Sequence, residues 1–210
     1  MGTGQEWQGG LRRIGPPRVV PATAQVPVYS RHPMTAPSAA LTRFDHAVLR
    51  STRRTLGGTP AVPVARGLSH FGEHALGWLA LGAAGWATGR RRDEWVSGMV
   101  GVVAAHAAGV AVKRVVRRVR PSLEDVPPLV GTPSRLSFPS AHSCSTAAAA
   151  VGFGPMVGGP PMAAVTVVML VSRVLLGVHY PSDVVSGAAL GAGVATVVRR
   201  RTTGDAGRKA

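Results

Sequence analysis

The chain has 210 residues and carries 24 Lys and Arg against 9 Asp and Glu, a formal net charge of +15. Only 16% of its residues are charged and 45% are hydrophobic, whereas a soluble domain has about 25% charged residues. This composition excludes a collagen-like chain and a chain that is disordered throughout. The single cysteine, Cys144, excludes an intramolecular disulfide and any multi-cysteine metal site.

The first part of the chain has no apolar periodicity. Residues 1–40 mix Pro, Gly, Arg and Thr, which predicts a disordered basic segment. Residues 41–73 are predicted to form an amphipathic helix and a connector, because Leu, Phe and Val recur near helical spacing between Arg residues over 41–54. Two interpretations are open for this helix. It lies on an anionic bilayer, or it is a solvated helix that packs on the rest of the fold.

Long stretches with few charges follow, and Arg clusters flank them. The stretch at 95–112 would be about 27 Å long as a helix, close to the thickness of a bilayer core. These stretches predict an all-α fold, a polytopic membrane bundle of about five transmembrane helices within 74–198, followed by a basic tail at 199–210. The alternative is a soluble helical protein with buried Ala-rich helices. The predicted spans are 74–89, 95–112, 143–159, 160–178 and 181–198.

Small residues are abundant in the last predicted span. Gly187, Gly191 and Gly193, with Ala188 and Ala192, are expected to give it a small-residue face that allows close helix packing.

Polar residues gather in three segments, 113–121, 137–143 and 172–183, each at a predicted membrane boundary. Because consecutive spans cross in opposite directions, all three segments are expected on one membrane face. Arg173 interrupts an apolar stretch, where an arginine at the centre of a span costs about 2.5–3.5 kcal/mol. Such a charge indicates function and requires an anionic partner.

The same three segments contain the elements of a phosphate site. Asp183 follows His179 by four residues and falls in the first turn of a helix that begins near Pro181, where a carboxylate is favoured. A carboxylate beside an imidazole fixes its tautomer and makes it a better nucleophile or base. Backbone N–H groups where a helix begins, after Ser140, form an anion site. Lys113, one of only two lysines in the chain, adds positive charge nearby.

The order K-x6-R-P, then P-S-x-H, then S-R-x5-H-x3-D resembles the signature of the type-2 phosphatidic-acid phosphatase superfamily, in its bacterial membrane branch. The resemblance covers about residues 74–198 and implies a membrane phosphatase that hydrolyses a lipid phosphate monoester without a metal or other cofactor. It implies a phosphohistidine on His179, which Asp183 orients, with His142 as the general acid. It implies phosphate binding by Lys113, Arg120, Ser140, Ala141 and Arg173.

One position departs from the family pattern. Ala141 stands where the family usually has Gly, which would cost stability if the position requires a positive φ. His106, inside a predicted span, is assigned to packing.

Several questions of partner and placement stay open. Short chains of this family resemble enzymes that act on polyprenyl phosphates, and phosphatidic acid and phosphatidylglycerophosphate are alternatives. The loop 122–135 is expected to select the head group. Basic residues are usually more numerous on the cytoplasmic face, so a count of all of them places the site in the cytoplasm. A count that leaves out the functional cations and the distant N-terminal arginines favours the extracytoplasmic face. Anionic membrane lipids are expected partners.

Three other functions compete with the lipid phosphatase. A non-enzymatic membrane scaffold would not need the His, Asp and Arg set, and a vanadate-dependent haloperoxidase would share the three motifs. A nucleic-acid binder is disfavoured, because only 5% of residues are aromatic and no base-reading motif is present.

Overall fold

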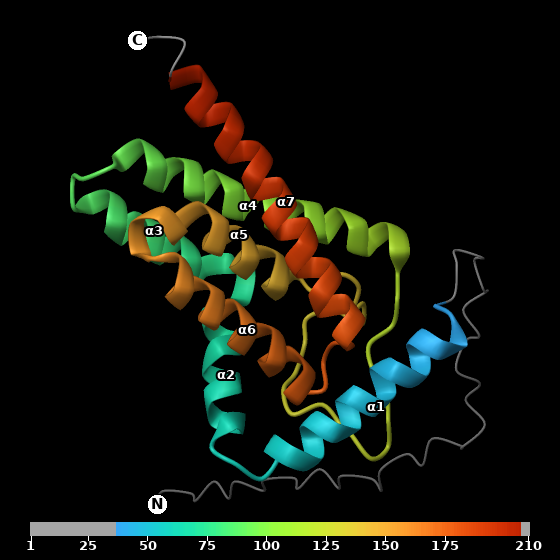
Figure 1. Ribbon diagram of the computed structural model, residues 1–210. Helices are drawn as coiled ribbons and strands as arrows, with labels where there is room; N and C mark the ends of the chain where they lie inside the picture. The colour runs from blue at the N-terminus through green and yellow to red at the C-terminus, as the bar shows by residue number, and fades with distance from the viewer. Residues whose placement is uncertain (1–36, 207–210) are drawn as a thin grey trace, which may run out of the picture. The chain divides into compact units, whose positions relative to one another are not determined.

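The structure is a computed structural model that describes residues 37–206, with side chains described as far as Thr202. Within this range the fold is all-α, as predicted, and the only β-structure is two isolated bridges. The helices, shown in Figure 1, are α1 (Ala39–Leu56), α2 (Ala61–Phe71), the 3-10 helix η1 (Glu73–Ala75), α3 (Leu76–Ala87), α4 (Arg92–Val116), α5 (Ala141–Val157), α6 (Gly159–Leu175) and α7 (Pro181–Ala206).

Both ends of the described chain are more helical than expected. The predicted disordered segment lies almost entirely outside the described residues, but its last two positions already belong to α1, which Ser38 caps by accepting from the backbone N–H of Leu41 at 3.2 Å. The expected connector contains α2, and α7 continues through the first residues of the basic tail.

Helix α5 lies at the centre of the bundle and packs against α4, α6 and α7. Its small side chains, from Ser143 to Ala149, are all buried, so its apolar character serves the protein core. Two glycines bring α7 against it. A Cβ at Gly187 would lie 2.6 Å from the carbonyl oxygen of Ser140, and one at Gly191 would overlap the carbonyl oxygen of Cys144. Gly193 faces open space, so the prediction that it shares this face was wrong.

Helix α1 packs on α6 and α7 through one face. Leu49 and Asp45 on that face are fully buried, whereas Phe44 is 58% exposed. The interpretation in which this helix packs on the bundle is therefore confirmed for one face. The alternative, in which this helix lies on an anionic bilayer, stays a prediction.

Two helices, α4 and α7, are long and apolar enough to cross a membrane. Helix α6 is apolar but has 17 residues, α3 has 12 and α5 has 17, whereas about 20 are needed to span a bilayer. The predicted count of five spans is not confirmed. Large apolar side chains nevertheless face outward on three helices: Val96, Val100, Val103 and Val115 on α4, Val165, Val167, Val168 and Val171 on α6, and Val185 and Val197 on α7.

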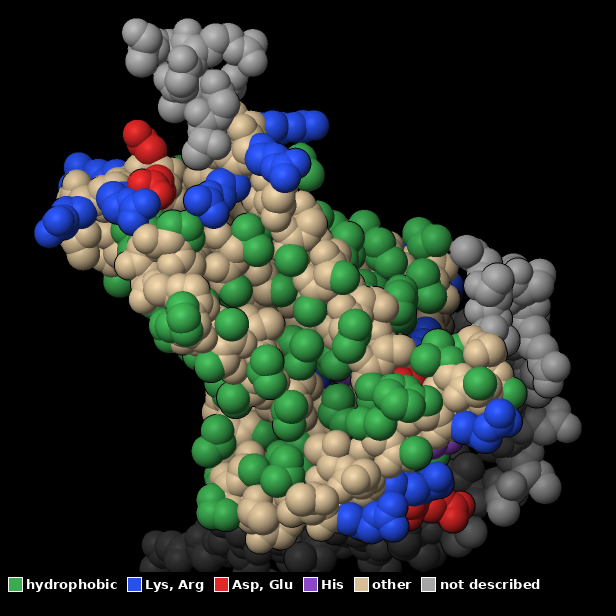
Figure 2. Space-filling model, viewed as in Figure 1, with side chains coloured by type: hydrophobic (Ala, Val, Ile, Leu, Met, Phe, Trp, Pro, Cys, Tyr) green, Lys and Arg blue, Asp and Glu red, His purple; other side chains and the backbone are tan. Residues whose placement is uncertain are grey.

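Figure 2 shows one face of the molecule, on which hydrophobic side chains are spread over the middle and most of the visible Lys and Arg side chains gather toward two ends. Exposed apolar surface of this extent, with charges at its margins, is typical of a protein that contacts lipid.

Candidate active site

The three polar segments meet at one end of the bundle, as predicted. The guanidinium of Arg120, in the loop after α4, donates from Nε to the carbonyl oxygen of Ser134 at 2.7 Å and from Nη1 to that of Val178 at 2.6 Å. Its Nη1 also lies 3.0 Å from Nε2 of His179, between α6 and α7. Where α5 begins, the backbone N–H of Ser140 donates to the carbonyl oxygen of Asp183 at 3.1 Å.

His179 lies in the tight turn that follows α6. Gly177 makes this turn possible with a φ of 71°, a conformation that side chains with a Cβ rarely adopt. Because an arginine nitrogen can only donate, Nε2 of His179 accepts from Arg120, and the ring proton is assigned to Nδ1. The imidazole is therefore neutral, with its lone pair on the nitrogen that faces the cations. A neutral imidazole with this tautomer has the form that a nucleophile requires.

Electrostatics favour the same protonation state. Burial, followed by the positive charges of Arg120, Arg173 and Lys113, holds the pKa of His179 well below its usual value. Burial also lowers the pKa of Arg120 to about 10, which leaves its guanidinium charged at neutral pH. The site thus pairs a neutral imidazole with permanent positive charge, which is the arrangement that binds a phosphate dianion.

Asp183 is fully buried in the first turn of α7, the position predicted from the sequence. Its Oδ2 accepts from the backbone N–H of Tyr180 at 2.9 Å and lies 3.8 Å from Nδ1 of His179. That distance is too long for a hydrogen bond, and Nδ1 is buried without a partner. A small rotation of the imidazole would form the bond, as is common when a substrate tightens a catalytic site.

His142 and Arg173 meet at a residue of α2. The carbonyl oxygen of Ser69 accepts from Nε2 of His142 at 3.0 Å, so this nitrogen carries a proton. The hydroxyl of Ser69 accepts from Nη1 of Arg173 at 2.7 Å. Arg173 is 2% exposed and its Nε is buried without a partner, so one of its donors is free for an anion. A Cβ at Gly72 would lie 2.6 Å from Cδ2 of His142, and the glycine thus leaves room for this ring.

The remaining predicted residues lie at helix ends beside these groups. Lys113, in the last turn of α4, interacts electrostatically with Arg120, Arg173 and Asp183. Ser140 caps α5, where its hydroxyl accepts from the backbone N–H of Ser143 at 3.4 Å. Ala141 is the first residue of α5 and is absent from the positive-φ positions of the described chain. Alanine therefore carries no backbone strain at this position.

Four residues that the sequence did not single out complete the surroundings: Asp45, Ser69, Arg118 and Ser182. Arg118 donates to Asp183 at 2.8 Å and to Asp45 at 2.8 Å. It lies in a basic run beside a predicted span, and nothing in its spacing separates it from its neighbours. One feature of the sequence could have pointed to Asp45. Acidic residues are rare in this chain, and this one falls within an otherwise basic helix.

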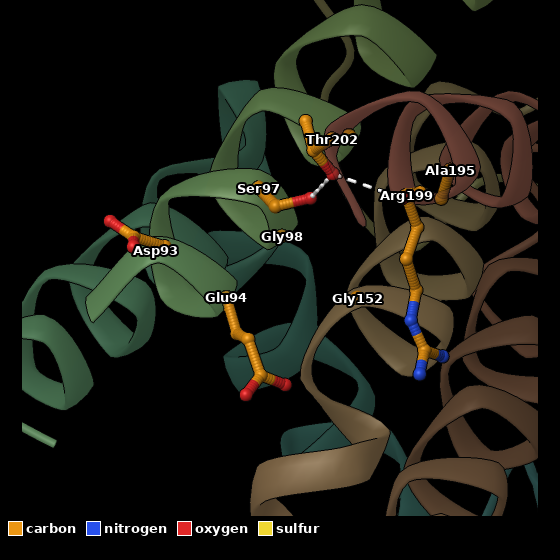
Figure 3. A pocket seen from close by; sticks show the side chains of 9 residues that line it. Asp93, Glu94, Ser97, Gly98, Gly152, Ala195, Arg199 and Thr202 are labelled. Carbon is orange, nitrogen blue, oxygen red and sulfur yellow. Dashed lines mark hydrogen bonds between the residues drawn. The ribbon is translucent and has the colours of Figure 1, made fainter. Parts of the chain in front are cut away.

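A separate pocket of about 150 Å³ lies between α4, α5 and α7, and none of the candidate residues lines it. Figure 3 shows Ser97 and Thr202 joined across it by a hydrogen bond of 2.7 Å between their hydroxyl groups. Among the described residues, no group of three or more His, Cys, Asp or Glu is arranged to hold a metal ion.

The family model of the PAP2 superfamily matches residues 95–204. The chain is 53% identical over 147 residues to a decaprenylphosphoryl-5-phosphoribose phosphatase of Mycolicibacterium smegmatis. The matched residues make up 69% of this chain and 82% of the relative. It is 49% identical over 158 residues to a protein of the same name from Mycobacterium tuberculosis, covering 74% of this chain and 89% of that one. The chain therefore belongs to the PAP2 superfamily.

Solved structures agree with this assignment. A transmembrane PAP2-type phosphatidylglycerolphosphate phosphatase from Bacillus subtilis superimposes with a TM-score of 0.65 at 25% identity, covering 77% of this chain and 86% of the other. LpxE of Aquifex aeolicus shares the fold, with a TM-score of 0.61 at 18% identity and coverage of 75% and 95%. The protein is a membrane phosphatase that acts on a lipid phosphate, as the three motifs predicted.

Proposed function

We propose that this enzyme removes the terminal phosphate from decaprenylphosphoryl-5-phosphoribose through a phosphohistidine on His179. The observation that carries the proposal is the position of the neutral, buried imidazole of His179. Its Nε2 lies 3.0 Å from the guanidinium of Arg120, a group that can bind phosphate. The substrate is inferred from relatives that are about half identical over most of their length. Phosphatidylglycerophosphate is the second candidate substrate, because a structural neighbour at 25% identity is named as a phosphatase of that lipid.

In the first step, the phosphate displaces Arg120 from Nε2 and takes donors from Lys113, Arg120 and Arg173, together with Ser140 and the backbone N–H of Ala141. Nε2 attacks phosphorus, and an N–P bond forms as the P–O bond to the sugar breaks. His142, in its imidazolium form, gives its Nε2 proton to the leaving alkoxide and becomes neutral. Asp183 meanwhile accepts from Nδ1 of His179 and stabilises the positive imidazole of that residue.

In the second step, His142 takes a proton from water, whose oxygen attacks phosphorus. The N–P bond breaks, inorganic phosphate leaves, and His179 regains its lone pair. The cations balance the charge that develops on the phosphoryl oxygens in both steps.

A panel of lipid phosphates in detergent micelles tests the substrate assignment. We expect kcat/KM for decaprenylphosphoryl-5-phosphoribose to exceed that for phosphatidylglycerophosphate and phosphatidic acid by about tenfold or more, because a site that hydrogen-bonds a sugar discriminates against head groups lacking it. Release should persist in EDTA. A preference for phosphatidylglycerophosphate would reassign the substrate, and a loss in EDTA that added metal restores would contradict the metal-free mechanism.

We further propose a multi-pass arrangement in which α4, α6 and α7 cross the bilayer, α3 and α5 complete the bundle, and the site opens on the extracytoplasmic face. The outward-facing valines on α4, α6 and α7 support lipid contact on these helices. Arg90, Arg91 and Arg92 at one end, with the arginines that begin the tail, would then meet anionic head groups.

A single cysteine introduced in the loop after α4 tests which membrane face the site opens on. Ser122 is exposed and the native Cys144 is buried, so Ser122→Cys should react with an impermeant maleimide on intact cells. Thr88→Cys, an exposed position in the turn between α3 and α4, is the matched control and should react only after lysis. The reverse labelling pattern would place the site in the cytoplasm.

A further inference from the structure

A buried ion network joins the N-terminal helix to the active site. We propose that Asp45 and Arg118 are positioning residues that hold Asp183 in place against His179, so that α1 takes part in catalysis without touching the substrate. The inference rests on the proposed function, in which Asp183 accepts from the ring of His179. Asp45 lies outside the part of the chain that the family model matches.

Arg118 stands between two carboxylates. Its Nη1 donates to Oδ1 of Asp183 at 2.8 Å and its Nη2 donates to Oδ2 of Asp45 at 2.8 Å. Both carboxylates are fully buried, and the side chain of Arg118 is 15% exposed. The guanidinium also lies over the ring of Tyr180, with its carbon 4.0 Å from the ring centre. Contacts on several sides fix its orientation, and each donor faces a defined acceptor.

Asp45 also holds the beginning of α7. Its Oδ1 accepts from the backbone N–H of Ser182 at 3.0 Å, and its Oδ2 accepts from the hydroxyl of Ser182 at 2.6 Å. Arg118 donates to that same hydroxyl oxygen at 2.7 Å. Residue 182 precedes Asp183 directly, so the carboxylate of α1 fixes both the backbone at this point and the arginine that binds Asp183.

The network determines which oxygen of Asp183 is available to His179. Arg118 engages Oδ1, whereas Oδ2 accepts from the backbone N–H of Tyr180 and lies 3.8 Å from Nδ1 of His179. If Asp45 lost its charge, Arg118 would lose one of its two anchors and could turn away from Oδ1. Asp183 could then rotate, and Oδ2 would no longer face the imidazole. A displacement of this kind lowers the rate of the chemical step more than it weakens substrate binding.

The same helix offers a matched control. Arg50 of α1 pairs with Asp125 of the loop after α4 at 2.6 Å, but both side chains are exposed, at 42% and 55%. This pair ties α1 to the loop without approaching Asp183. Arg50→Gln should therefore leave kcat unchanged.

Asp45→Asn is expected to lower kcat by about tenfold or more while KM changes by less than about threefold. The test that separates positioning from mere stability is a double-mutant cycle in the full-length enzyme. Asp45→Asn in the background of Asp183→Asn should cause almost no further loss, because the carboxylate through which Asp45 acts is already gone. Inhibition by inorganic phosphate checks that each variant still binds the anion.

Two results would overturn the inference: an Asp45→Asn enzyme with kcat within about twofold of wild type, or losses that multiply in the double variant. If Asp45→Asn does not fold, Arg118→Lys replaces it in the cycle, because lysine keeps the charge but cannot bind two carboxylates in the same way. His179→Ala separates the two proposals. Full activity in that variant would overturn the proposed function together with this inference, whereas an inactive His179→Ala beside a fully active Asp45→Asn would overturn this inference alone.

Discussion

His179→Ala is expected to reduce phosphate release from the lipid substrate by about four orders of magnitude or more, because removal of a covalent nucleophile abolishes the reaction path rather than slowing it. KM and inhibition by inorganic phosphate should change little, since the cations that bind the anion are intact. Acid-labile, base-stable phosphate should be trapped on the wild-type chain after rapid quenching and be absent from the variant.

The control for this variant is His70→Ala, which removes an exposed histidine of α2. It should release phosphate at the wild-type rate. Phosphate trapped on the His179→Ala chain, or release above about one tenth of wild type, would contradict the assignment of the nucleophile.

His142→Ala is expected to lower kcat on the lipid substrate by about 10² to 10⁴, the range typical of a lost general acid. The loss should depend on the leaving group. A sugar alkoxide needs a proton as it departs, whereas the nitrophenolate of p-nitrophenyl phosphate leaves without one. The rate of phosphohistidine formation with this activated ester should therefore fall much less than the rate with the lipid.

Single-turnover rates with both substrates provide the measurement. Because His142 is also proposed to activate water in the second step, the rate of phosphohistidine formation has to be separated from its hydrolysis. Equal losses in the first step with both substrates would contradict the role as an acid. They would indicate instead that the ring of His142, which donates to the carbonyl oxygen of Ser69, mainly holds α2 against α5.

The sequence was sufficient to predict which residues meet at the site because its main residues lie where helices begin or end. Lys113 is in the last turn of α4, Ser140 caps α5, and Asp183 is in the first turn of α7. Alternating helix directions bring such ends together whatever the details of packing. The close approach of Arg120 to His179 therefore followed from the order of the motifs.

The inward turn of Arg118 was not predictable in the same way. It belongs to a run of basic residues in which Arg114 and Arg117 are exposed. Helix α4 ends at Val116, and the next residue, Arg117, has a left-handed conformation with a φ of 54°, which redirects the chain immediately before Arg118. Spacing in the sequence does not reveal such a bend. Asp45 was missed for a related reason, since amphipathicity assigns a charged residue to the outer face, whereas tertiary pairing buries this one.

The count of five spans is not confirmed, and composition alone is a poor basis for such a count because lipid-facing and core-facing helices have similar compositions. Helix α5 is apolar and rich in small residues, yet its side chains are buried among α4, α6 and α7. An apolar composition indicates that a helix is shielded from water. It does not show whether the helix packs against another helix or against lipid.

The contact of Gly187 and Gly191 with the backbone of α5 has a consequence for an enzyme surrounded by lipid. In the proposed arrangement, the outward valines of α4, α6 and α7 are the side chains that contact the acyl chains. The two halves of the site, one at the start of α5 and one at the start of α7, are joined by main chain against main chain, with Ser140 donating to Asp183. In that arrangement the lipid contacts side chains, whereas backbone contacts set the distance between the beginning of α5 and the beginning of α7.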